Sequence, residues 1–84
     1  MIALYVLQSE TSGRYYVGST SDLDRRLEEH RRNHTPSTRG RGPWKLVHLE
    51  EFPVLLSARR RERQIKGWKS HLKIQQLVAG KQPG

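Results

Sequence analysis

Two short apolar segments near the N-terminus, joined by a turn, constrain the fold of this chain more than any other feature. Residues 2–7 are apolar, β-branched or aromatic and are too few for a stable helix, which predicts a buried strand. Residues 14–18 favour extended structure again, and a turn-forming Glu-Thr-Ser-Gly cluster separates the two segments. So short a connection predicts an antiparallel hairpin whose strands pair directly.

A helix is predicted over residues 22–32. It opens on a Ser-x-x-Asp pattern, whose acids favour the positive end of the helix dipole. Leu23 and Leu27 form an apolar stripe, and Arg26 and His30 lie on the same face. An arginine and a histidine are therefore expected at the border of the buried stripe.

A loop and a third strand are predicted next. Residues 33–43 have no apolar residue and are rich in glycine, proline and serine or threonine, which indicates an exposed loop. Residues 44–50 alternate in the manner of a strand. That alternation places Trp44, Leu46 and His48 on one side of it.

The C-terminal part predicts two helices. The first begins after Pro53, with Ser57 as its N-cap, and Gly67 indicates a break. Residues 72–79 then form the last helix, and residues 81–84 are expected to be a frayed tail.

A chain of 84 residues accommodates one small core, so we expect a single domain over residues 1–80. The predicted order of elements is β-β-α-β-α-α. Because three strands need helices to cover their faces, this order predicts an α+β protein of the broad α/β class. Its core would be a small three-stranded, mainly antiparallel sheet flanked by helices.

Composition restricts the class of partner. Sixteen Lys and Arg against eight Asp and Glu give a net charge of +8. Without cysteine the chain has no disulfide and no Cys-type zinc site, and no apolar run approaches the roughly 20 residues of a membrane span. We therefore expect a cytoplasmic protein with no membrane segment and a polyanionic partner, nucleic acid before an anionic membrane surface.

Glu62 is the most informative single residue, because it is the one acid after Glu51 and lies on the shoulder of a helix's apolar face. An ion pair with Lys66 explains it simply, and an exposed i,i+4 pair is worth about 0.3 to 0.5 kcal/mol. The functional interpretation is a divalent-metal site, since one carboxylate with waters and phosphate oxygens is a usual way to hold Mg²⁺. The helix alone leaves both interpretations open.

Two further residue pairs also admit two interpretations. Tyr5 and Tyr16 fall on adjacent predicted strands, where side chains on one face come close together. Arg26 and His30 are four residues apart on one helical face, so both can point at a single phosphate. Ordinary packing explains any of the four taken alone.

The order and spacing of these residues follow a known pattern. The chain carries, in order, Ala3-Leu4-Tyr5, Tyr16-Val17-Gly18, Asp22-Leu23, Arg26-Leu27, His30, Ala58, Glu62, Ile65, Lys66 and Trp68. This arrangement resembles the GIY-YIG endonuclease superfamily over residues 2–79, and residues 38–47 are similar to its small, free-standing bacterial members. Ala3, Leu4 and Val17 depart from the family's name motif at packing positions, whereas both tyrosines are present.

The resemblance implies metal-dependent hydrolysis of DNA phosphodiester bonds, in DNA repair, recombination or the processing of single-stranded or branched DNA. Glu62 would hold one Mg²⁺ or Mn²⁺ ion, and Tyr5 would act as general base or relay for the attacking water. Arg26 would contact the phosphate oxygens where charge builds, and Tyr16 and His30 would position water and phosphate.

A non-catalytic basic nucleic-acid-binding module is the alternative. Either function would use phosphate contacts from Arg39, Arg41, Lys45, Arg59, Arg63, Lys66 and Lys69. One isolated acid among cations favours the nuclease, because without a metal it would repel phosphate. Specificity would come from the loop, from DNA shape or from a protein partner, and the sequence indicates no oligomeric state.

Overall fold

The computed structural model describes residues 1–32 and 38–80. Its elements are, in order, β1 (Ala3–Ser9), β2 (Tyr15–Thr20), α1 (Leu23–Arg31), β3 (Trp44–Glu51), α2 (Leu55–Gly67) and α3 (His71–Val78). The predicted order of elements is confirmed, and the strands form one antiparallel sheet in the order β2-β1-β3. The expected frayed tail, residues 81–84, lies outside the described residues.

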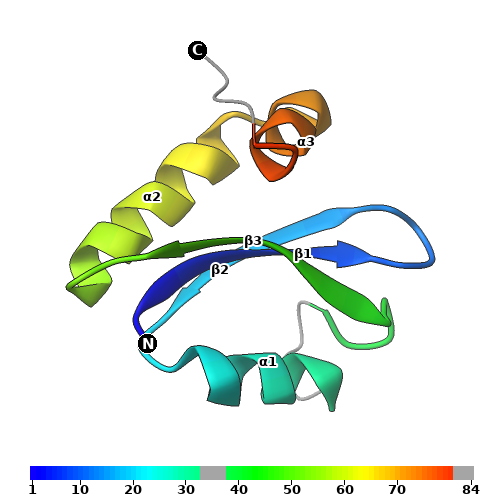
Figure 1. Ribbon diagram of the computed structural model, residues 1–84. Helices are drawn as coiled ribbons and strands as arrows, with labels where there is room; N and C mark the ends of the chain where they lie inside the picture. The colour runs from blue at the N-terminus through cyan, green and yellow to red at the C-terminus, as the bar shows by residue number, and fades with distance from the viewer. Residues whose placement is uncertain (33–37, 81–84) are drawn as a thin grey trace.

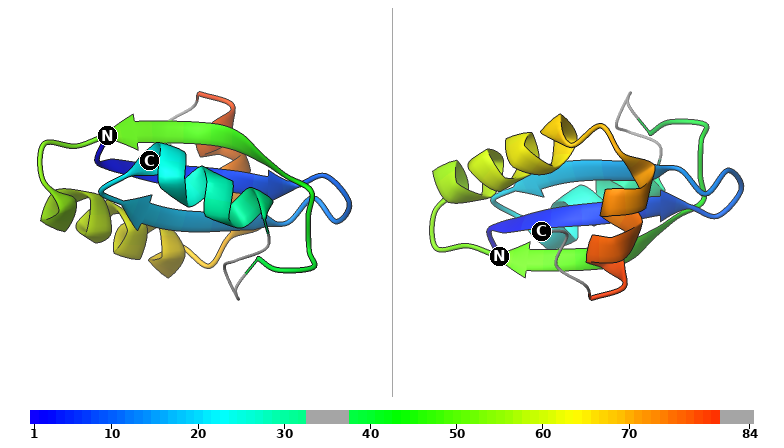
Figure 2. Two further views of the ribbon diagram at one scale, coloured as in Figure 1. Left: turned by 90° about the horizontal axis from the view of Figure 1, so that it is seen from below. Right: turned by 90° about the horizontal axis from the view of Figure 1, so that it is seen from above.

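Helices cover both faces of the sheet. Figure 1 shows α1 on one face and α2 and α3 on the other. Seen from above, α2 runs beside β2, and α3 crosses toward β3 (Figure 2, right). The edge strand β2 is therefore flanked by helices from both layers. None of the helices in the described ranges is long and apolar enough to cross a membrane.

The central strand β1 divides its side chains between two cores. Leu4 and Val6 are fully buried on the α2 and α3 side, in an aliphatic cluster with Ile65 of α2 and Leu77 of α3. The intervening residues, among them Tyr5, are buried beneath α1. Alternation along a strand therefore gives each helical layer its own core.

A β-bulge in the pairing of β1 with β3 corrects one prediction. Val6 lies opposite His48, whereas Leu7 lies opposite Leu46, so Val47 is an extra residue on β3. Because Val6 and Leu7 point to opposite faces, Leu46 and His48 do so too. The predicted shared face of Leu46 and His48 is therefore wrong.

The start of α2 corrects a second prediction. The carbonyl of Val54 already accepts from the amide of Ala58 (3.4 Å), so Val54 is the N-cap and Ser57 lies within the first turn. No side chain caps this helix. At α3 the hydroxyl of Ser70 accepts from the amide of Lys73 (3.2 Å) and supplies the cap directly.

The segment before β3 is more tightly held than its composition predicts. Thr38, expected in an exposed loop, is fully buried. The Trp44 indole donates to its carbonyl (3.0 Å), and the Ser9 hydroxyl donates to the carbonyl of Arg41 (2.8 Å). The hydrogen bond from Ser9 thus holds this polar segment against the end of β1. Of the expected loop, residues 33–37 lie outside the described part.

Candidate active site

A pocket of about 180 Å³ opens at the edge of β2, between α1 and α2. It is lined by Tyr5, Tyr16, Gly18, Ser19, Arg26, Arg59 and Glu62. Four of the five candidate catalytic residues meet here, although β1, β2, α1 and α2 each supply different ones. The fifth, His30, contacts Tyr5 from α1, with 2.9 Å between its Nε2 and the phenol oxygen.

Gly18 opens this pocket past the edge strand. It pairs with Tyr5 across the sheet, and the ring of Tyr5 lies directly against it. A Cβ at position 18 would lie 2.5 Å from the Tyr5 hydroxyl oxygen, far inside van der Waals contact. The missing side chain therefore lets the phenol reach the edge of the sheet, where Glu62 approaches from α2.

A buried chain of polar side chains runs from the pocket into the α1 layer. Tyr5 is 1 % exposed, His30 2 % and Thr38 0 %. His30 Nδ1 lies 2.8 Å from the Thr38 hydroxyl, while its Nε2 bonds to Tyr5. The ring of Tyr16 packs edge-on against His30, with centroids 5.1 Å apart. The imidazole is thus fixed by a contact at each nitrogen and by packing against Tyr16.

Burial sets the protonation states of Tyr5 and His30. It raises the pKa of Tyr5 well above its usual range, and Tyr16 and Glu62 raise it further, while Arg26 opposes them. Burial also lowers the pKa of His30, helped by the Arg26 cation and opposed by Glu29. Both groups are therefore neutral near pH 7.

Glu62 is held by a residue on each side. Its Oε1 accepts from the hydroxyl of Ser19 on β2, and its Oε2 pairs with the ammonium of Lys66 (2.6 Å). The ion pair expected from the sequence is therefore present, at the mouth of a pocket that also holds the tyrosines. The two interpretations of Glu62 are compatible.

The donor set at Glu62 suits a cation that brings most of its own ligands. In the described ranges, no three His, Cys, Asp or Glu residues group closely enough to hold a metal ion by themselves. One carboxylate beside hydroxyl groups matches Mg²⁺ or Mn²⁺ completed by water and phosphate oxygens. A tightly bound structural metal does not fit these residues.

The basic candidates divide into two groups. Arg59, Arg63 and Lys66 line a second pocket, of about 310 Å³, on the other side of Glu62. Arg26 lines the first pocket and pairs with Glu29 (3.1 Å). Lys69 lies beyond α2 in the turn to α3. Arg39, Arg41 and Lys45 are exposed around the start of β3.

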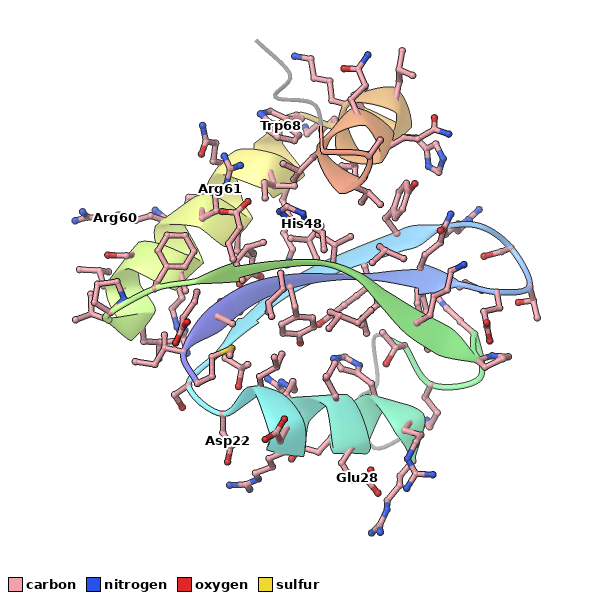
Figure 3. The ribbon with its side chains drawn as sticks, in the orientation of Figure 1. Asp22, Glu28, His48, Arg60, Arg61 and Trp68 are labelled. Atoms are coloured by element: carbon pink, nitrogen blue, oxygen red, sulfur yellow. The ribbon has the colours of Figure 1, made fainter. Side chains whose placement is uncertain are left out.

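Another charged cluster belongs to the opposite face. Figure 3 shows His48 and Arg61 close together between the sheet and α2, while Arg60 points away from the molecule. Glu50 joins them, accepting from Arg61 Nε (2.9 Å) and lying 2.8 Å from His48. This cluster links α2 to β3. Because Arg61 is paired with Glu50 and largely buried, it is not one of the exposed cations available to phosphate.

Sequence reasoning missed two polar residues. Ser19 directly follows the second tyrosine motif, and only the fold shows that it faces Glu62 across 43 positions of sequence. Thr38 lies in a polar segment without periodicity, so no local signal predicts its burial. Both bear on residues that were predicted, Glu62 and His30.

Comparison with known proteins identifies the family of this chain. The family model described as the GIY-YIG catalytic domain matches residues 1–75. The UPF0213 protein BH0048 of Halalkalibacterium halodurans is 39% identical over 77 residues, which cover 90% of this chain and 80% of that protein. A UPF0213 protein of Halobacterium salinarum is 42% identical over 64 residues, covering 75% of this chain and 82% of the relative.

A solved structure supports the fold as well. The solution NMR structure of UPF0213 protein BH0048 from Bacillus halodurans superposes with a TM-score of 0.59 at 38% identity, over 93% of this chain and 82% of that one. The resemblance inferred from the tyrosines, His30 and Glu62 is confirmed. The chain belongs to the GIY-YIG nuclease family, and its relatives are small UPF0213 proteins.

Proposed function

We propose that this chain is a metal-dependent endonuclease that hydrolyses DNA phosphodiester bonds in the pocket at the edge of β2. The observation that carries the proposal is convergence: Tyr5, Tyr16, Arg26 and Glu62 line one small pocket although they come from four different elements. A surface that only binds DNA has no need to gather two phenols and a carboxylate beside an arginine. Phosphate hydrolysis uses each of them.

Tyr5 acts as a relay for the proton of the attacking water. Its raised pKa makes it a poor source of free phenolate near neutral pH, so it needs a partner that takes its own proton. His30 is neutral there, and its Nε2 lies 2.9 Å from the phenol oxygen. As water gives a proton to Tyr5, the phenol passes its proton to His30 Nε2.

The other pocket residues bind the phosphate, position the water and bind the metal ion. Arg26 binds the non-bridging oxygens of the scissile phosphate, where negative charge builds, and Tyr16 positions the water. Glu62 would hold Mg²⁺ or Mn²⁺, and the hydroxyl of Ser19 fixes the carboxylate. An ion bound there would supply positive charge to the phosphate and to the departing 3′ oxygen. Arg59 and Arg63 contact neighbouring phosphates of the same strand.

DNA is the substrate class that charge and family favour together. The net charge is +8, and Arg59, Arg63 and Lys66 surround the carboxylate. DNA repair, recombination and the processing of single-stranded or branched DNA all supply such a substrate. A protein partner would add specificity that a chain of this size does not carry itself.

The test is Glu62→Gln, which removes the charge but keeps the shape. Labelled single-stranded, duplex and branched DNA would be incubated with Mg²⁺, Mn²⁺ or a chelator. We expect wild-type cleavage that depends on the metal, and a loss of about a thousandfold or more in the variant. DNA binding, measured in the chelator, should remain, because the substitution removes a repulsive charge.

Glu51→Gln is the matched control, since Glu51 is an exposed acid on β3. It should cleave like the wild type. Full activity of Glu62→Gln would refute the metal-ligand role. Binding of DNA by the wild type without cleavage of any of the three substrates would instead support the non-catalytic binding module.

A further inference from the structure

Thr38 is a fully buried polar residue in a segment that otherwise exposes its side chains. Arg39, Gly40 and Arg41, which follow it, are all exposed. Its hydroxyl lies 2.8 Å from His30 Nδ1, and its carbonyl accepts from the indole of Trp44. Burying a hydroxyl is favourable only when it is hydrogen-bonded, so the contact with His30 deserves a chemical explanation.

The hydrogen-bonding needs of Tyr5 determine where the protons lie between Tyr5, His30 and Thr38. The phenol is neutral and buried, so its O–H needs an acceptor. Arg26 acts on the same phenol, but a guanidinium carries only donors. Among the described hydrogen bonds, His30 Nε2 is the acceptor within reach of the phenol oxygen. A lone pair on Nε2 satisfies this O–H inside the protein, whereas in the Nε2–H tautomer the phenol would have to turn its O–H toward the open pocket.

A neutral imidazole with a lone pair on Nε2 carries its proton on Nδ1. That proton points at Thr38, whose hydroxyl oxygen accepts it. We propose that Thr38 is a positioning residue that holds His30 in the Nδ1–H tautomer and so keeps Nε2 ready to receive the proton of Tyr5. The tautomer follows from the contacts alone, whereas its catalytic consequence rests on the proposed function.

The role of Thr38 continues through the proton transfer. The O–H bond of Tyr5 breaks, an N–H bond forms at His30 Nε2, and the phenol oxygen gains a proton from water. His30 is then an imidazolium with protons on both nitrogens. The Thr38 oxygen still accepts from Nδ1–H, and this hydrogen bond is stronger once the donor is charged. Thr38 therefore favours the protonated form of His30 in a site that burial otherwise makes unfavourable.

The first experiment uses the wild-type protein and needs no cleavage assay. Two-dimensional ¹H–¹⁵N correlation of the histidine side chains at pH 7.5 distinguishes the two tautomers by the ¹⁵N shifts of Nδ1 and Nε2. We expect the protonated nitrogen of His30 to be Nδ1. A wild-type His30 protonated on Nε2 would overturn the inference, even if the protein cleaves DNA as proposed.

The second experiment compares Thr38→Val with Thr38→Ser. Valine keeps the shape but removes the acceptor, so we expect the Nε2–H tautomer to become populated and kcat to fall about tenfold, with KM for DNA changed less than about twofold. Serine restores the acceptor and should restore both the ¹⁵N shifts and kcat. Ser12→Ala, which removes the hydroxyl of an exposed residue between β1 and β2, should change neither.

The outcomes separate the two proposals. If His30 of the wild type is protonated on Nδ1 but neither the wild type nor any variant cleaves DNA, the tautomer assignment stands and the nuclease proposal is rejected. Normal kcat in Thr38→Val together with a shifted tautomer would reject the role of Thr38 in catalysis. If the valine variant does not fold, the ¹⁵N shifts of the wild-type protein still decide which nitrogen of His30 carries the proton.

Discussion

The two faces of β1 bury neighbouring residues in contrasting surroundings. On the α2 and α3 side, Leu4 and Val6 pack in an aliphatic cluster with Val17, Ile65 and Leu77. On the α1 side, Tyr5 is as deeply buried but hydrogen-bonds to His30, which continues to Thr38. One face therefore gains stability from apolar burial, which needs no directional contacts, while the other holds polar groups at fixed distances.

The aliphatic core explains how so small a domain can keep polar side chains buried beside it. Buried polar groups are costly unless each has a partner, so a hydrogen-bonded interior must be held by a rigid neighbour. The aliphatic cluster supplies that rigidity directly behind Tyr5, through the same strand. Substitutions on the aliphatic face should therefore lower stability and leave kcat of the folded protein unchanged. Substitutions on the polar face should lower kcat by more than any loss of folded protein explains.

The largest effect on folding is expected from Leu77→Ala in α3. Leu77 is 2 % exposed in the aliphatic cluster, and truncating such a leucine costs about 2 to 5 kcal/mol. Leu72→Ala on the same helix is the matched control, because Leu72 is 61 % exposed and should change stability little. Urea titration of both variants measures the difference.

Cleavage then tests the separation of the faces. At a temperature where Leu77→Ala remains folded, its kcat should lie within about twofold of the wild type, since α3 supplies no residue that lines the pocket. A strong loss of kcat in the folded variant would show that the two faces are not independent.

The next effect is expected from Gly18→Ala at the edge of β2. The new methyl group would meet the Tyr5 hydroxyl at 2.5 Å, so the phenol must move away from its partners. Overpacking of this kind costs about 1 to 3 kcal/mol in stability. The displaced relay should lower kcat about a hundredfold, well beyond the loss of folded protein.

Gly67→Ala is the control for this substitution. Nothing lies within 4 Å of a Cβ built at Gly67, which ends α2, so this variant should fold and cleave normally. Normal cleavage by folded Gly18→Ala would contradict the placement of Tyr5 at the reaction centre.

The contrast between the faces also explains what the sequence could predict. The aliphatic face follows from short-range patterns: residues 2–7 predict β1, and the order of all six elements follows from periodicity and turns. Tyr5, Tyr16, Arg26 and Glu62 were assigned to one site by resemblance, and the structure brings them to one pocket. Each of these signals is local or lies in a known pattern.

The failures share a different cause. Thr38 is buried because His30 and Trp44 bond to it, and Ser19 meets Glu62 only once α2 lies beside β2. The bulge that separates Leu46 from His48 arises from pairing with β1, which alternation along β3 does not contain. Such features depend on contacts between distant parts of the chain.

The smallest effect is expected in the dependence of stability on pH, where His30 gives the polar face a signature that the aliphatic face lacks. Burial, and then Arg26, lower the pKa of His30 in the folded protein, while the unfolded chain keeps a value of about 6.5. Below about pH 6.5 the unfolded chain therefore binds a proton that the folded protein does not, and stability falls. Above that pH both forms are neutral, so the contribution of His30 is fully retained.

Urea titrations between pH 5 and 7.5 measure this dependence in the wild type, His30→Gln and His71→Gln. The titratable and charged groups that face His30 are Tyr5, Tyr16, Arg26 and Glu29. We expect the slope of stability against pH to flatten in His30→Gln and to persist in His71→Gln, because His71 is exposed. Equal slopes in all three proteins would mean that His30 is not desolvated, and the polar face would then lack the dry interior that a proton relay between Tyr5 and His30 requires.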